Sequence, residues 1–130
     1  MPAPSSPKDC PCGGGPYAAC CGRFHAGEAA LTAEQLMRSR YSAYVLNDTA
    51  YLLQSWHAST RPAAAELEQE PGGKWLGLEV KRHVPMGDEA TVEFVARYKT
   101  AGRAHRLHEV SRFVREDGAW FYVAGDFPQK

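Results

Sequence analysis

Residues 90–98 read Ala-Thr-Val-Glu-Phe-Val-Ala-Arg-Tyr, and this stretch decides the fold class. Its even-numbered positions carry apolar or aromatic residues, while Thr91, Glu93 and Arg97 stand between them. A period of two is typical of a β-strand that buries one face and exposes the other. The stretch therefore predicts a strand packed against a core on one side.

The same alternation recurs in three further segments on either side: residues 76–81, 109–114 and 120–123. Short turn sequences separate the four segments: Met86-Gly87-Asp88, the residues near Gly102, and Glu116-Asp117-Gly118. Connections this short join neighbouring strands as hairpins, in which the two strands are antiparallel. The C-terminal half is thus predicted to be a four-stranded antiparallel meander.

The sequence before the strands has the longer period of helices. Thr32 can cap a helix whose apolar positions recur at helical spacing from Leu36 to Val45, and Gln35 follows three residues after the cap. Leu31 is expected to pack against Leu36 across this cap. Asn47-Asp48 is expected to end that helix and to cap a second one over residues 49–56.

A short acidic helix is predicted for residues 63–70, because Arg61-Pro62 breaks the chain before it and Pro71-Gly72-Gly73 stops it. Helices followed by an antiparallel meander are typical of an α+β fold, with the helices packed on one face of a curved sheet. We expect three parts: a flexible tail over residues 1–9, a cysteine knuckle with its linker over 10–29, and the main domain over 30–130.

The composition favours an ordinary folded protein. Hydrophobic residues make up 44% of the 130 residues and charged residues 23%, with 15 basic and 15 acidic side chains. A chain with zero net charge has no overall field that attracts nucleic acid or anionic membranes. No apolar run approaches the roughly 18 residues of a membrane span. Residues 1–9 lack the apolar centre of a secretory signal, so we expect a cytoplasmic protein.

All four cysteines lie in one short segment: Cys10, Cys12, Cys20 and Cys21. Two close thiolate pairs joined by a glycine-rich turn can converge on one tetrahedral zinc ion. We expect one structural zinc per chain, because a segment this short has no core of its own. Redox-active thiols and two small-loop disulfides remain alternatives, and His25 can in principle replace one thiolate.

The order Cys-Pro-Cys-Gly, Tyr17 and Cys-Cys resembles the SEC-C motif, the zinc-binding motif also found at the C-terminus of the SecA translocation ATPase. Seven residues separate Cys12 from Cys20 where the motif is expected to have eight, and the shortening falls in the glycine turn. In SecA the motif recruits a partner chaperone and contacts lipid, so the resemblance implies a protein-docking knuckle. Tyr17 is the candidate partner contact.

The rest of the chain is similar to the YchJ family of uncharacterised bacterial proteins. The segments that carry the resemblance are spread over nearly the whole chain: residues 25–28, 36–44, 56–62, 75–78, 109–113 and 120–122. The resemblance implies a nuclear-transport-factor-2-like (or cystatin-like) fold, in which helices and a strongly bent sheet enclose a cavity. Unrelated proteins of this fold bind or transform small molecules there, so the fold alone does not assign a reaction.

Ten polar or aromatic residues are candidates for lining such a cavity: Arg38, Arg40, Tyr41, Tyr44, Trp56, His57, Arg97, Glu109, Ser111 and Arg112. Glu109 shares a strand face with Phe113, so it is expected to be buried and to need a partner. A buried carboxylate can act as a general base, and His57 can do the same. A structural Glu–Arg pair is the simpler interpretation of Glu109.

Two functions follow as hypotheses. The first is a non-enzymatic zinc-binding interaction module, in which the knuckle binds a protein partner and the main domain binds a ligand or partner. The second is a small-molecule enzyme of isomerase or hydrolase type, with Glu109 or His57 as the base. The catalytic residues stay unassigned. Nucleic acid is not an expected partner, since Lys8 and Arg23 are the only basic residues near the knuckle.

Overall fold

A computed structural model describes residues 9–13, 15–63 and 74–127. Its elements follow in the order expected from the sequence: η1 (Tyr17–Ala19), α1 (Cys21–His25), α2 (Ala33–Leu46), α3 (Thr49–Gln54), β1 (Lys74–Met86), β2 (Glu89–Thr100), β3 (Arg103–Glu116) and β4 (Ala119–Asp126). Nearly all of the tail (residues 1–9) and of the predicted acidic helix (63–70) lies outside the described residues.

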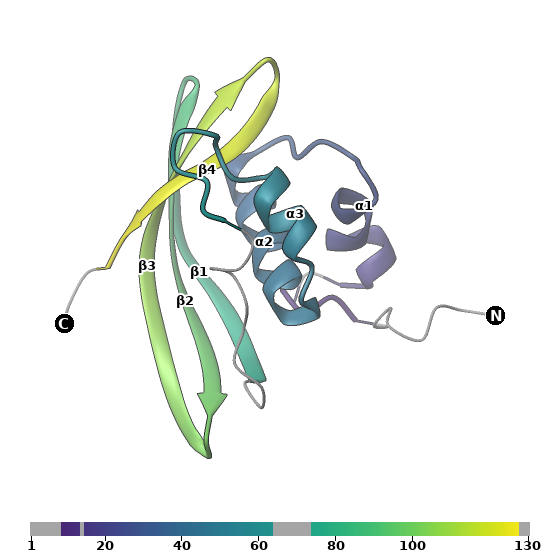
Figure 1. Cartoon of the computed structure of the whole chain (residues 1–130), viewed down its shortest axis with the longest axis vertical. Coiled ribbons are helices and arrows are strands. Elements are labelled where there is room, and N and C mark those ends of the chain that lie inside the picture. The colour runs from purple at the N-terminus through teal and green to yellow at the C-terminus, as the bar shows by residue number, and fades with distance from the viewer. Residues whose placement is uncertain (1–8, 14, 64–73, 128–130) are drawn as a thin grey trace.

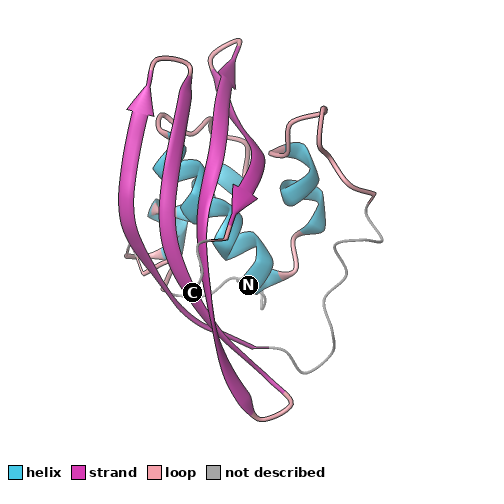
Figure 2. Cartoon of the chain, turned by 90° about the vertical axis from the view of Figure 1, so that its left-hand side faces the viewer, coloured by secondary structure: helices cyan, strands magenta, loops and turns pink. Residues whose placement is uncertain are grey.

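The four strands form one antiparallel sheet in the order β1-β2-β3-β4, which confirms the predicted meander. Figure 2 shows the long strands curving around the helices on one side. Each strand extends beyond its alternating segment, because the hairpin partners continue to pair up to the tight turns. Those turns contain positive-φ residues, among them Gly87 (68°) and Gly118 (80°), where glycine avoids the strain of a side chain.

Helix α2 starts at its predicted cap, since the Thr32 side chain accepts a hydrogen bond from the amide of Gln35. The predicted packing of Leu31 on Leu36 is wrong: Leu31 is 76% exposed. Its amide instead donates to the Gln35 side chain at 2.8 Å, so a hydrogen bond takes the place of the apolar contact. Asn47 in the left-handed conformation ends the helix.

Helix α3 is capped by Asp48 as predicted, but it ends at Gln54 rather than Trp56. The chain leaves the helix there because it pairs with β4: His57 donates its amide hydrogen to Tyr122 O at 2.7 Å, and Tyr122 donates to Ser55 O at 2.9 Å. This short bridge fastens the end of α3 to the sheet. None of the helices in the described parts of the chain is long and apolar enough to cross a bilayer.

One hydrophobic core runs from the sheet through α2 to the N-terminal cysteine segment. Buried Cys21 and Phe24 belong to the same cluster as Met37 of α2 and Val92 and Phe113 of the sheet. Figure 1 shows α2 and α3 between the sheet and α1. The predicted α+β fold is confirmed, and the N-terminal segment packs as part of it rather than standing apart.

Candidate functional site

The four cysteines converge beside α2, next to Arg38 and Ser42. One sulfur from each of Cys10, Cys12, Cys20 and Cys21 belongs to a group whose members all lie within 4.8 Å of one another. Three of these residues are buried and Cys20 is partly exposed. Two residues come from the loop before η1, and two from the junction between η1 and α1.

This arrangement fits a tetrahedral metal ion better than disulfides. Sulfurs at the corners of a zinc tetrahedron, with Zn–S bonds near 2.3 Å, lie about 3.8 Å apart. The Cys12 and Cys20 sulfurs are 3.5 Å apart, far longer than a disulfide bond, and all four cysteines are free. Four protein ligands would close the coordination shell and leave no position for a substrate.

The electrostatics of the cluster favour a bound cation. Burial and the neighbouring Cys12 thiol raise the pKa of Cys20 to about 11. The hydrogen bond with Cys12 and burial also raise the pKa of Cys21. Thiols packed this closely resist losing their protons unless a positive charge compensates the thiolates. A divalent ion would supply that charge, so the donor set suits zinc.

The loop between the cysteine pairs closes on itself in spite of its short spacing. The amide of Cys10 donates to Gly15 O at 2.7 Å, and the amide of Gly13 donates to Cys10 O at 2.9 Å. Gly13 and Gly15 have φ values of 86° and 118°, which other residues rarely adopt. The shortened glycine turn therefore still brings the two cysteine pairs together.

The knuckle (residues 10–25) is held on α2 by polar contacts as well as by packing. The Cys10 sulfur lies 3.4 Å from Ser42 Oγ. Arg38 donates from Nη1 to Cys12 O at 3.3 Å, while its Nε donates to Glu34 at 3.0 Å. Arg38, a candidate for the cavity by sequence, is thus placed at the knuckle instead.

A hydrogen-bond chain through His25 makes a second link that sequence reasoning missed. Tyr17 Oη lies 2.6 Å from His25 Nδ1, and His25 Nε2 lies 2.9 Å from the carbonyl oxygen of Ser39. A carbonyl can only accept, so Nε2 carries the proton and Nδ1 accepts from the Tyr17 hydroxyl. Both ring nitrogens are used, and His25 is not in the cysteine group. The spacing of Tyr17 and His25, eight residues apart across the Cys-Cys pair, is the only sequence signal for this contact.

Gly22 makes room for Tyr17 in this arrangement. A Cβ at position 22 would lie 2.7 Å from Tyr17 O and 2.8 Å from its ring. Tyr17 is only half-exposed, and its hydroxyl is used within the chain. Tyr17, the candidate partner contact, therefore contributes to the internal structure of the knuckle.

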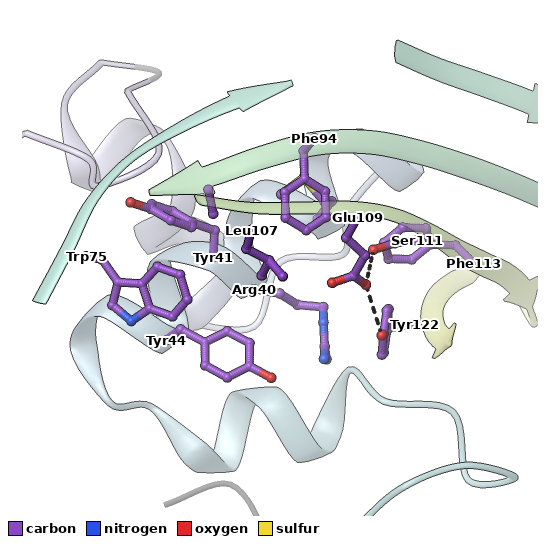
Figure 3. Close-up of a pocket in the computed structure, with 12 residues that line it drawn as sticks. Arg40, Tyr41, Tyr44, Trp75, Phe94, Leu107, Glu109, Ser111, Phe113 and Tyr122 are labelled. Atoms are coloured by element: carbon purple, nitrogen blue, oxygen red, sulfur yellow. Dashed lines mark hydrogen bonds between the residues drawn. The ribbon is translucent and has the colours of Figure 1, made fainter. Parts of the chain in front are cut away.

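A cavity of about 260 Å³ lies on the other side of α2, between that helix and the sheet. Figure 3 shows the side chains that surround it. Half of them are aromatic, and only two are ionisable at neutral pH. The lining residues are Met37, Arg40, Tyr41, Tyr44, Trp75, Phe94, Ala96, Leu107, Glu109, Ser111, Phe113 and Tyr122.

Glu109 is the only carboxylate among the lining residues, and it is 8% exposed. Its Oε2 accepts hydrogen bonds from Ser111 Oγ at 2.7 Å and from Tyr122 Oη at 3.1 Å. The carboxylate lies over the backbone of Gly125 on β4, where any Cβ would collide with it. Burial and the charge of Glu109 raise the pKa of Tyr122, which keeps that hydroxyl protonated as a donor.

Arg40 is the only cation among the lining residues, and it is 5% exposed. Its Nη1 donates to Leu52 O at 2.9 Å and to Ser55 Oγ at 2.7 Å. Its guanidinium also packs against the rings of Trp56 and Tyr122, at 4.8 and 4.4 Å from their centroids. Burial lowers the pKa of Arg40, and the nearby tyrosines and Glu109 oppose that shift.

The structure brings five sequence candidates into the cavity wall: Arg40, Tyr41, Tyr44, Glu109 and Ser111. It places the other candidates outside: Arg38, Trp56, His57, Arg97 and Arg112. The residues missed by sequence reasoning are mainly apolar or aromatic, including Trp75, Leu107 and Tyr122. They come from separate strands, so the only sequence signal for them is that each occupies an inward-facing position of its strand.

Each outside candidate has a physical reason for its position. Trp56 packs behind the cavity wall, against Arg40 and Tyr122. His57 follows α3 and contacts Glu116 at 2.8 Å.

Arg97 and Arg112 are exposed on the opposite face of their strands, and Arg112 lies 3.6 Å from Asp126. Side chains at odd and even strand positions face opposite ways, which separates Arg112 from Ser111.

Comparisons with known proteins agree with this architecture. Residues 32–125 match the family model described as "YchJ, middle NTF2-like domain". A UPF0225 protein of Ralstonia nicotianae is 59% identical, over 97% of this chain and 96% of its own length. A UPF0225 protein of Cupriavidus metallidurans is 61% identical, over 95% and 92%.

Two solved structures described as SEC-C motif containing proteins are similar along nearly the whole chain. The solution structure from Rhodopseudomonas palustris has a TM-score of 0.86 and 31% identity, covering 93% of this chain and 99% of that one. The crystal structure from Psychrobacter arcticus has a TM-score of 0.79 and 29% identity, covering 96% and 85%. With the fold, the cysteine cluster and these matches together, the chain belongs to the YchJ-like UPF0225 family, with an N-terminal cysteine cluster and an NTF2-like domain.

Proposed function

We propose that this protein is a cytoplasmic, non-enzymatic binding module that holds one structural zinc ion in its knuckle. The four-sulfur group within 4.8 Å carries the proposal. Cys10, Cys12, Cys20 and Cys21 are the ligands, and the NTF2-like domain binds a small ligand in its cavity. A reducing compartment suits the proposal because it keeps clustered thiols available to metal.

The closed ligand set supports a structural and docking role rather than hydrolysis at the metal. Around the cluster, Pro16, Ala18 and Ala19 are exposed, while Tyr17 between them is half-buried. These small side chains offer a compact surface held rigid by the ion, to which a protein partner can bind. The similar proteins described as containing the SEC-C motif support this assignment.

Metal analysis of the purified full chain tests the zinc site. We expect about one zinc ion per chain. Cobalt(II) substitution should give the visible absorption of a tetrahedral site with four sulfur ligands. A metal-free protein with oxidised cysteines, or a cobalt spectrum indicating fewer than three sulfurs, would contradict the proposal.

The docking surface needs a variant that leaves the metal site intact. Ala18→Asp changes an exposed residue, whereas Tyr17→Ala would also remove the contact with His25. Co-purification from cells followed by mass spectrometry should recover a protein with the wild type that the zinc-loaded Ala18→Asp variant loses. Equal recovery with both would contradict docking through residues 13–19.

One observation favours enzyme activity as a second candidate function. Glu109 reaches the cavity and is held by two hydroxyl donors rather than by an arginine ion pair. A carboxylate in this position can take a proton from a bound carbon or oxygen acid. His57 does not support this function, since it lies outside the cavity wall. Turnover that Glu109→Gln abolishes even at saturating ligand would establish catalysis over binding alone.

A further inference from the structure

The polar end of the cavity contains one positive and one negative side chain that do not pair with each other. No nitrogen of Arg40 lies within 4.0 Å of a carboxylate oxygen of Glu109, so the two form no ion pair. Both are more than nine-tenths buried. Holding two buried charges apart costs free energy unless something polar interacts with each of them.

Both side chains keep unused hydrogen-bonding atoms. The two hydrogen bonds of Glu109 go to Oε2, and Oε1 has no hydrogen-bond partner among the described residues. Figure 3 shows Oε1 pointing away from Ser111 and Tyr122, into the cavity. Arg40 donates only from Nη1, which leaves Nε and Nη2 without acceptors in the described structure. The cavity therefore offers a ligand one acceptor atom, Glu109 Oε1, and nearby donor nitrogens on Arg40.

The other walls are flat and apolar. Tyr41 packs edge-on against Trp75, with ring centroids 5.6 Å apart, and Tyr44 lies 5.9 Å from the same ring. Aromatic walls like these favour a planar ligand. The volume of about 260 Å³ is just below the usual range for drug-sized ligands, so one or two rings would fill it.

We infer that the cavity binds a small, uncharged, planar compound that carries an N–H beside a C=O, as a cyclic amide does. The N–H donates to Glu109 Oε1, and the carbonyl oxygen accepts from Arg40. The charges of the site cancel, so a neutral ligand avoids burying an unbalanced charge. This inference rests on the proposed ligand-binding function and specifies the ligand class.

Titration of the zinc-loaded full chain with three related probes tests the inference. 2-Quinolone carries the N–H and the C=O, N-methyl-2-quinolone lacks the N–H, and quinoline lacks both. Dissociation constants come from NMR shifts of the Ser111 and Tyr122 amides. We expect 2-quinolone to bind about tenfold or more tightly than either other probe, since a hydrogen bond to a carboxylate is a strong one.

Two variants and one control assign the effect to the Glu109 carboxylate. Glu109→Gln should weaken 2-quinolone binding about tenfold and should not weaken quinoline binding in the same way, because quinoline has no N–H to donate to the carboxylate. Gly125→Ala should weaken it as well, because the added Cβ displaces the carboxylate. Glu93→Gln is the control, since Glu93 lies outside the cavity wall and contacts His108 at 2.7 Å. Glu109→Gln alone decides the test if Gly125→Ala does not fold.

The outcomes separate the ligand class from ligand binding itself. Equal affinity for the three probes would overturn the N–H and C=O requirement while supporting a ligand-binding cavity. Unchanged 2-quinolone binding in Glu109→Gln would overturn the role of the carboxylate. Absence of shifts with every probe would overturn both the ligand class and the ligand-binding part of the proposed function, and would leave the zinc proposal to the metal analysis.

Discussion

Arg38 and Arg40 stand two positions apart on α2 and reach opposite sides of that helix. Arg38 donates to the carbonyl of Cys12 in the knuckle, whereas Arg40 lines the cavity and donates to Leu52 O. Helix α2 is therefore a shared wall between the cysteine cluster and the cavity. Its side chains at positions 37, 40, 41 and 44 line the cavity, while those at 38 and 42 contact the cysteine segment.

The two arginines should differ in their effect on stability. Arg38→Met should lower the free energy of unfolding by about 1 kcal/mol, because its contacts are half-exposed. Arg40→Met should lower it by about 3 kcal/mol, because buried hydrogen bonds and two ring contacts are lost together. Urea denaturation of the zinc-loaded proteins measures both. A larger loss for Arg38→Met would contradict the placement of these side chains.

The Tyr17–His25 contact should control how firmly the knuckle holds the proposed zinc ion. Tyr17→Phe removes the donor to His25 and keeps the ring, so we expect about 1 kcal/mol lower stability and faster zinc release. Gly22→Ala should release zinc faster still, because its Cβ would collide with the Tyr17 backbone. The rate of zinc transfer to a colorimetric chelator measures zinc release in both variants. Release as slow as in the wild type, in both variants, would show that this contact does not brace the knuckle.

Alkaline pH should destabilise the fold through Tyr122. Burial and the charge of Glu109 raise the pKa of Tyr122 in the folded state above the value of about 10 that is usual for tyrosine. The folded protein thus keeps a proton that the unfolded chain loses, so the stabilisation is complete below about pH 10 and declines as the pH rises further. Denaturant melts on either side of that pH should show a smaller decline for Tyr122→Phe. The same decline in both proteins would assign the effect to other groups, such as half-buried Tyr44 and buried Tyr51, whose pKa values desolvation also raises.

His57 should matter little to the cavity. Its contacts with Glu116 and Ser59 lie outside the lining, and Glu116 is exposed. His57→Gln should therefore cost at most about 1 kcal/mol and leave 2-quinolone binding unchanged. Titration by NMR, as for the wild type, measures the affinity. A large loss of affinity would restore His57 as a functional residue of the cavity.

Local patterns in the sequence were enough for the order and kind of the elements. Thr32 and Asp48 cap their helices as predicted, and the alternation around residues 90–98 marks a strand that buries Ala90, Val92, Phe94 and Ala96. These features depend on neighbours within a few residues, where backbone geometry sets the period. The clustering of four cysteines likewise predicted that their sulfurs converge, because residues this close in sequence lie close in space.

Only the tertiary structure decided which polar residues share a site. Arg40 of α2 and Glu109 of β3 line one cavity because α2 packs over the sheet, while Arg97 of β2 and Arg112 of β3 are exposed on the other face. The sequence by itself determined the fold class, the helix caps and the cysteine cluster. The tertiary structure decided that the knuckle shares a core with the main domain and that Glu109 rests over Gly125. Such contacts join residues far apart in the chain, and the curvature of the sheet, which no short segment specifies, sets the distances between them.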